Sequence, residues 1–325
     1  MSKVQESVEL SDTVKPVFRI KNWSEYNKAL EQRGNLMLYI DPTVFENWYA
    51  PGSSQQGGQF IYSDHSVQFV LTFKILFGLT YRAARGFVES LLSLMGHSHL
   101  KVMSCSQACR RLRTLSIPDF DIPHTDKMHL AIDSTGLKIY GEGEWKCRKH
   151  GVGKRRTWRK LHLAVDTDTH YIHAHVTTTN SEGDAAQLPE LLEQVSGQVE
   201  EVSADGAYDT AACYEECIER NISLLTPPRE GAVEWCEDQP GDMKNHPRNI
   251  AVRRVDEASR KQWKVESGYH KRSISETAMM RVKTIFSGRC FSRLLSSQRK
   301  EISLKIYLLN LMTSMGMPIS VRVGT

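Results

Sequence analysis

The chain has 325 residues, of which 40% are hydrophobic and 8% aromatic. This composition is ordinary for a globular protein that buries real cores, and it excludes global disorder. The net charge of +4 and the isoelectric point of about 8.6 are a mild basic excess that does not by itself indicate a nucleic acid partner.

The cysteines and the apolar segments indicate the cellular compartment in which the protein is expected. Seven cysteines are an odd number, and residues 1–15 contain no apolar signal core, so an oxidising compartment is not expected. The longest apolar window, residues 69–79, is interrupted by Lys74 and is too short to span a bilayer. We therefore expect a cytoplasmic protein with reduced thiols and no membrane segment.

Residues 1–62 are expected to form an N-terminal leader and accessory segment. Within it, an amphipathic pattern predicts a helix over residues 23–34. The apolar residues 35–40 that follow predict a short strand.

The next segment, residues 63–117, has helical periodicity. Ser63 and Thr80 are suitable N-caps for two helices, and Gly78 supplies a turn between them. The predicted helices cover residues 64–77, 81–94 and 105–115.

The third of these helices carries a cluster of arginines, namely Arg110, Arg111 and Arg113. Two helices, a short turn and a basic helix are compatible with a helix-turn-helix DNA-binding region, in which arginines contact phosphates and base edges. A plain helical bundle with a solvated basic face explains the same residues about as well. This segment alone leaves both interpretations open.

After a linker marked by Pro118 and Pro123, the pattern changes, and residues 124–325 are predicted to form a separate domain. Strands are predicted at residues 128–136, 159–166, 171–178, 199–206 and 222–225, with helices at residues 184–195 and 210–220. Three antiparallel strands followed by alternating helices and strands predict an α/β domain with a mixed sheet covered by helices, which is the order of an RNase H-like fold. Residues 227–256 are expected to be irregular. A helix containing Glu276 and a last helix at residues 301–315 complete the domain.

Two aspartates are predicted at the ends of neighbouring strands. Asp133 ends the first strand and Asp205 the fourth, and each is followed closely by a glycine that lets the chain turn away. Unpaired carboxylates side by side repel each other, so the arrangement favours a divalent cation between them. Glu276, on a helix that crosses the sheet, is placed to supply a third carboxylate. Such a site suits phosphoryl transfer by two metal ions.

The Glu276 helix carries a polar stripe. At about 100° of rotation per residue, four polar side chains fall near one line along the helix: Tyr269, Arg272, Glu276 and Lys283. An apolar stripe lies opposite, formed by Ile274, Ala278, Val282 and Ile285. An exposed Arg272–Glu276 pair, stabilising by about 0.3–0.5 kcal/mol, would explain the stripe only if no other acids converged there. With Asp133 and Asp205 present, Arg272 is interpreted as a phosphate clamp, and Tyr269 and Lys283 as groups that orient DNA.

Three other aspartates compete by position. Asp168 lies in a predicted hairpin turn and Asp209 is a predicted helix cap, so each has a structural reason to be present. Asp166 remains the open alternative to the three chosen acids.

A basic segment separates the first two strands. Residues 145–160 contain eight lysines or arginines and no acid, bracketed by two tryptophans, a composition suited to phosphate neutralisation and stacking. A solvated loop is the ordinary explanation of a charge run. Its position beside the predicted metal site favours a path for DNA, with these candidate contacts: Arg148, Lys149, Lys154, Arg155, Arg156 and Trp158.

The motifs resemble those of the DDE transposases of bacterial insertion sequences, in the branch with a Tyr-x2-Arg-x3-Glu-x6-Lys signature. Tyr269, Arg272, Glu276 and Lys283 match that spacing without a gap. Asp133 and Asp205 match the first and second acidic motifs, and residues 309–318 are similar to the C-terminal ending of this branch. The resemblance covers roughly residues 63–318.

The resemblance implies an activity and its cofactors. Asp133, Asp205 and Glu276 would bind two Mg²⁺ ions, with Mn²⁺ able to substitute, and the enzyme would cut DNA at the terminal inverted repeats. The new 3′-hydroxyl ends would then attack target DNA, while Tyr269, Arg272 and Lys283 hold the DNA ends.

The leading hypothesis is therefore a metal-dependent DNA transposase. Double-stranded DNA would be its partner, both as transposon ends and as target, and the protein would associate with the nucleoid when bound. Pairing two ends requires a homodimer or higher oligomer on DNA. Two alternatives are a metal-dependent nuclease without strand transfer and a catalytically silent DNA-binding regulator.

Overall fold

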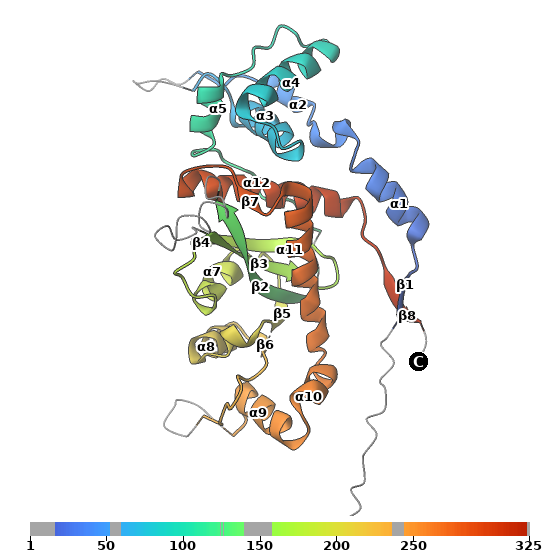
Figure 1. Cartoon of the computed structure of the whole chain (residues 1–325), viewed down its shortest axis with the longest axis vertical. Coiled ribbons are helices and arrows are strands. Elements are labelled where there is room, and N and C mark those ends of the chain that lie inside the picture. Colours follow the sequence, from blue (N-terminus) through green and yellow to red (C-terminus); the bar gives the residue numbers. More distant parts are fainter. Residues whose placement is uncertain are drawn as a thin grey trace, which may run out of the picture.

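A mixed β-sheet lies at the centre of the protein (Figure 1). The computed structural model describes residues 17–52, 60–123, 125, 127–139, 158–235 and 244–323. The sheet consists of β2 (Met128–Ile139), β3 (Trp158–Asp166), β4 (Ile172–Thr179), β5 (Val199–Ser203), β6 (Ser223–Leu225) and β7 (Arg289–Cys290). Its order is β4-β3-β2-β5-β6, with β7 beside β2. Strands β2, β3 and β4 run antiparallel, and β5, β6 and β7 join in parallel. The mixed sheet predicted from the sequence is confirmed.

Helices cover both faces of this sheet because its central strands bury side chains on both sides. On one face, Leu130 and Ile132 of β2 pack in a core with α7 (Leu188–Glu193) and α8 (Ala211–Glu219). On the other face, Leu161 and Leu163 of β3 pack in a core with α11 (Ser273–Phe286) and α12 (Leu295–Ser314). This layered arrangement is consistent with an RNase H-like fold.

The N-terminal region is mainly helical, as expected. It contains α1 (Trp23–Gln32), α2 (Thr43–Glu46), α3 (Asp64–Leu76), α4 (Tyr81–Leu94) and α5 (Cys105–Arg111). Ser63 and Thr80 cap α3 and α4 as predicted, each accepting a backbone N–H with its side-chain oxygen. The core of this region is continuous with that of α11 and α12. The N-terminal helices therefore rest directly on the helical layer of the sheet.

The structure of the N-terminal segment differs locally from the prediction. Residues 35–40 form a 3₁₀ turn, η1 (Leu36–Tyr39), rather than a strand, because the Asn35 side chain accepts the N–H of Met37 and caps the turn. Within the expected leader, β1 (Val17–Ile20) pairs antiparallel with β8 (Ser320–Val323). This two-stranded ribbon stands apart from the central sheet (Figure 1).

Two further predictions need correction. Helix α5 ends at Arg111 and not at residue 115. The segment expected to be irregular contains α9 (Pro247–Glu257), which starts with a proline at its first position and is capped by the ring of His246. Helix α10 (Arg260–Glu266) then leads to the Glu276 region. In the parts of the chain that the structure describes, no helix has the length and apolarity needed to cross a lipid bilayer.

Candidate active site

Asp133 lies in the middle of β2, which corrects the prediction that it ends the strand. The strand continues because Gly136 stays extended and pairs with Lys160 of β3. A Cβ atom at Gly136 would come within 3.2 Å of the Trp158 ring, so this glycine serves close packing and not a turn.

Asp133 lies beside a gap in the strand pairing along one edge of β2. Along this edge of β2, β5 pairs with residues 128–131 and β7 with residues 138–139. Among the described strands, none pairs with the stretch between them on that side. Asp133 belongs to this gap, and its side chain projects from a face of the sheet, where Arg272 contacts it.

Asp205 comes two residues after β5, which is the parallel neighbour of β2. Its carboxylate accepts the N–H of Ala207 at 2.9 Å and caps the short turn η3 (Gly206–Tyr208). The charge of Asp205 acts on the Asp133 carboxylate. Burial raises the pKa of Asp133, and the negative charge of Asp205 raises it further, against the lowering effects of the Ser134 N–H and Arg272.

Arg272 joins Asp133 to Glu276. Its Nη1 atom donates to Asp133 Oδ2 at 2.7 Å, and its Nη2 atom donates to Glu276 Oε1 at 2.5 Å. The side chains of Arg272 and Asp133 are 18% and 17% exposed, whereas that of Glu276 is 58% exposed. One guanidinium therefore holds a partly buried carboxylate from the sheet and an exposed carboxylate from α11.

The predicted polar stripe is not one continuous α-helix. Tyr269 and Arg272 belong to a 3₁₀ turn, η4 (Tyr269–Arg272), and α11 starts at the next residue. The Tyr269 ring is buried against Trp263. Burial raises the pKa of Tyr269 to about 12, with Asp205, Asp133 and Glu276 adding to the rise and Arg272 opposing it. The charges of all three acids thus act on this phenol.

Lys283 occupies the far end of the stripe. Its Nζ atom donates to Thr135 Oγ1 of β2 at 2.5 Å. Thr135 is two residues from Asp133, and alternate residues of a strand lie on the same face. Arg272 and Lys283 thus both reach the face of β2 that carries Asp133.

The buried face of α11 differs from the predicted one. Ala278 and Val282 are buried as expected, but Ile274 is half-buried and Ile285 is exposed. Met279 and Phe286 are buried instead. The packed face is therefore rotated toward the polar stripe, which explains why Arg272 and Lys283 meet the sheet rather than open solvent.

The residues expected to contact DNA differ in where they lie and in how far they are exposed. Five cations of the basic segment lie outside the described residues: Arg148, Lys149, Lys154, Arg155 and Arg156. Trp158 is half-buried at the start of β3, with the Lys138 ammonium 5.6 Å from its ring centre. In α5 and the turn after it, Arg110 and Arg113 are exposed. Arg111 is buried, and its Nη1 and Nη2 atoms donate to the Tyr62 carbonyl and the Asp64 carboxylate, so this side chain is held within the fold.

Two competing aspartates have structural partners. Asp166 is buried, and its carboxylate accepts the Asp168 N–H and the Thr169 hydroxyl within the β3–β4 hairpin. Asp209 is not a helix cap, since Thr210 caps α8. Its carboxylate instead accepts from Arg248 Nε at 2.8 Å in a buried ion pair. Sequence reasoning missed this pair and the Thr135–Lys283 contact, because no short-range pattern connects residues so far apart.

The acids offer suitable ligands for a divalent cation. Carboxylate oxygens are the donors that Mg²⁺ and Mn²⁺ prefer, and the mutual repulsion of Asp133 and Asp205 favours a cation beside them. Within the described ranges, no group of three or more His, Cys, Asp and Glu side chains is close enough to hold a metal ion as it stands. Arg272 is the positive group that now contacts two of the three acids. The donor chemistry fits a metal ion, although binding through both Asp133 and Glu276 would require the guanidinium to leave.

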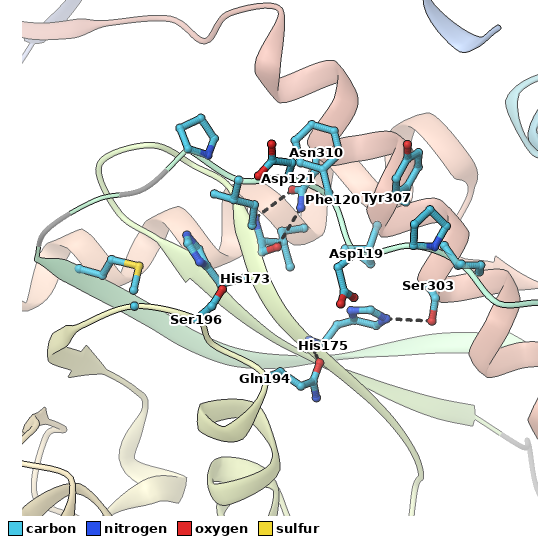
Figure 2. Close-up of a pocket in the computed structure, with 18 of the residues that line it drawn as sticks. Asp119, Phe120, Asp121, His173, His175, Gln194, Ser196, Ser303, Tyr307 and Asn310 are labelled. Carbon is cyan, nitrogen blue, oxygen red and sulfur yellow. Dashed lines mark hydrogen bonds between the residues drawn. The ribbon is translucent and has the colours of Figure 1, made fainter. Parts of the chain in front are cut away.

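A separate cavity of about 990 Å³ lies under the linker at residues 117–123 (Figure 2). In Figure 2 the Asp119 carboxylate lies beside the His175 ring, and His175 Nε2 contacts Ser303 Oγ at 3.0 Å. The Phe120 ring stacks on Tyr171. None of the acids considered above lines this cavity. The Phe120 ring also packs edge-on against Tyr307 of α12, so this aromatic side chain holds the linker against the fold.

Comparison with known proteins gives two family matches and a similarity to a solved structure. Two family models, each described as a transposase DDE domain, match residues 124–311 and residues 31–142. A cryo-EM structure of the piggyBac transposase synaptic complex with hairpin DNA is similar at 10% sequence identity and a TM-score of 0.37. That similarity covers 88% of this chain and 75% of the other.

Proposed function

The chain belongs to the family defined by the transposase DDE domain, and from this premise we propose that it is a DNA transposase of an insertion sequence. It binds the terminal inverted repeats of its element, cuts at the transposon ends and joins the 3′-hydroxyl ends to target DNA. The Tyr-x2-Arg-x3-Glu-x6-Lys spacing supports assignment to the branch with that signature.

One observation carries the proposal. Asp133 and Glu276 are 143 positions apart in sequence, yet they share one guanidinium, and the charge of Asp205 acts on Asp133. Structural ion pairs do not require a third acid beside them, whereas phosphoryl transfer by two metal ions does require several carboxylates in one place. Asp133, Asp205 and Glu276 are therefore the proposed metal-binding and catalytic residues.

DDE transposases generally use divalent metal ions, and we propose Mg²⁺, with Mn²⁺ as a substitute. Bound ions lower the pKa of the attacking water or hydroxyl and stabilise the leaving oxygen. The chain's own residues bind and orient the substrate. Arg272 offers a two-pronged donor for a backbone phosphate, and Lys283 offers a point charge on the same face of β2.

DNA binding beyond the cleaved bond is assigned to two regions. The exposed Arg110 and Arg113 of the N-terminal helical region provide cations for phosphates. The basic segment that precedes Trp158 in the sequence provides more. Since two DNA ends must be held together, the active form is a homodimer or a higher oligomer on DNA.

Replacing Asp133 with Asn tests the proposal. The change keeps the size of the side chain but removes a charged ligand, so nicking of DNA that carries the element's ends should fall on the order of a hundredfold or more in Mg²⁺. Asp168→Asn is the matched control, because this exposed hairpin carboxylate is outside the site, and it should cut at the wild-type rate. Undiminished nicking by a folded Asp133→Asn protein would sink the assignment.

A further inference from the structure

Both oxygens of the Asp133 carboxylate already accept a hydrogen bond. Asp133 Oδ1 accepts the Ser134 N–H at 2.8 Å, and Oδ2 accepts from Arg272. Glu276 Oε1 accepts from the other arm of the same guanidinium. A cation bound through Asp133 Oδ2 and Glu276 Oε1 would meet the positive charge of Arg272 at contact distance. Metal and guanidinium thus compete for the same two oxygens.

A guanidinium fork fits one carboxylate or phosphate best when both arms bind the same group. Here the arms are divided between two acids on different elements. A backbone phosphate would accept both arms together and carries a full negative charge. The Arg272 side chain is partly exposed and starts at the junction of η4 and α11, so exchange from the acids to a phosphate needs only side-chain rotation.

From this geometry, and resting on the proposed function, we propose that Arg272 is an internal counter-ion that withholds Asp133 and Glu276 from divalent metal until a DNA phosphate takes up its guanidinium. Arg272 acts here as a positioning residue that regulates access of metal to Asp133 and Glu276. It couples metal loading to DNA binding, so that the DNA-free protein binds metal weakly.

The test measures Mn²⁺ binding to the full-length, DNA-free protein by the electron paramagnetic resonance signal of free Mn²⁺. Arg272→Gln should bind Mn²⁺ about tenfold more tightly than the wild type, the change expected if about 1.4 kcal/mol of competition is removed. Lys283→Gln is the matched control. It removes the same charge from the same polar stripe, but Lys283 donates to the Thr135 hydroxyl and not to an acid. Its affinity should change by less than about threefold.

Two further measurements complete the test. Adding duplex DNA should reduce the difference in Mn²⁺ affinity between the wild type and Arg272→Gln, because the phosphate then holds the wild-type guanidinium. An equal gain in Mn²⁺ affinity in Arg272→Gln and Lys283→Gln, or no gain in Arg272→Gln, would overturn the counter-ion role. Either result would leave the proposed metal site intact. The double variant Arg272→Gln with Asp133→Asn should lose the gained Mn²⁺ affinity. If it retains that affinity, Asp133 is not a ligand, and the proposed function fails with the inference.

Discussion

Contacts made by single residues connect the loop that carries Asp205 to neighbouring segments. Asp209 follows Asp205 by four positions, and its carboxylate also accepts the backbone N–H of Arg229 at 3.1 Å. Arg248 of α9 completes the arrangement with its guanidinium over the Trp235 ring. Arg229 and helix α9 are therefore fixed to the loop that carries Asp205.

Arg248→Met should destabilise the protein by about 3–5 kcal/mol, because it leaves the Asp209 carboxylate buried without a counter-charge. Urea unfolding followed by circular dichroism measures the change. Arg253→Met on the same helix breaks an exposed pair with Glu234 and should cost less than about 1 kcal/mol. Equal losses in the two variants would contradict the structural role of the buried pair.

At this scale, the sequence offers candidates for the site but not their surroundings. Asp133, Asp205 and Glu276 are proposed from strand patterns and from the spacing around Glu276. The mid-strand position of Asp133 was not, because Gly136 looks like a turn residue until the Trp158 ring is known to lie against it. Buried partnerships such as Asp209–Arg248 depend on the tertiary fold and have no local signal.

At the scale of elements, α11 acts as the support that presents Glu276 and Lys283. It packs on β2, β3 and α12. Its inward residues fill the core shared by the sheet and the N-terminal helices, while Glu276 and Lys283 on its other side bind Arg272 and Thr135. The distance from Glu276 to the sheet therefore depends on the packing of this one face.

Met279→Ala should destabilise the protein by about 2–5 kcal/mol, since this side chain is only 6% exposed and its removal leaves a cavity. Met280→Ala changes the next residue in the same way, but Met280 is 60% exposed. That control should stay within about 0.5 kcal/mol of the wild type. Thermal and urea unfolding of both variants provide the comparison, and a large loss in Met280→Ala would show that the assigned face is wrong.

Element boundaries were predictable where capping residues set them. Ser63 and Thr80 identified the starts of α3 and α4 because their side-chain oxygens satisfy free N–H groups. The strand predicted at residues 35–40 failed because apolar composition alone does not reveal a turn capped by Asn35. The rotation of the α11 face was also hidden, since it results from contacts with the sheet and α12 on two sides.

At the scale of the whole molecule, histidines are packed into several parts of the fold. Burial lowers the pKa of these side chains: His129, His162, His170, His173, His175 and His246. For His175 the pKa falls to about 4. These rings remain neutral in the folded protein at pH values where an unfolded histidine, with a pKa near 6.5, is protonated.

The stability of the protein should therefore fall as the pH drops from about 7 to 5. The unfolded chain binds protons in this range that the folded chain does not, and each such proton contributes up to about 1.4 kcal/mol per pH unit. Urea unfolding at pH 7.5 and pH 5.5 measures the loss. His175→Gln should show a smaller pH dependence than the wild type. Identical stability of the wild type at the two pH values would contradict the prediction.

The most direct test of the central claim is a cleavage and joining assay on DNA that carries the sequences bordering the gene, with Mg²⁺ and a target plasmid. The wild-type protein should cut at the element ends and join the 3′-hydroxyl ends to the plasmid. Asp133→Asn, Asp205→Asn and Glu276→Gln should each lose both steps on the order of a hundredfold or more, while end binding persists. Cutting without joining by the wild type, or wild-type cutting by any of the three variants, would contradict the account.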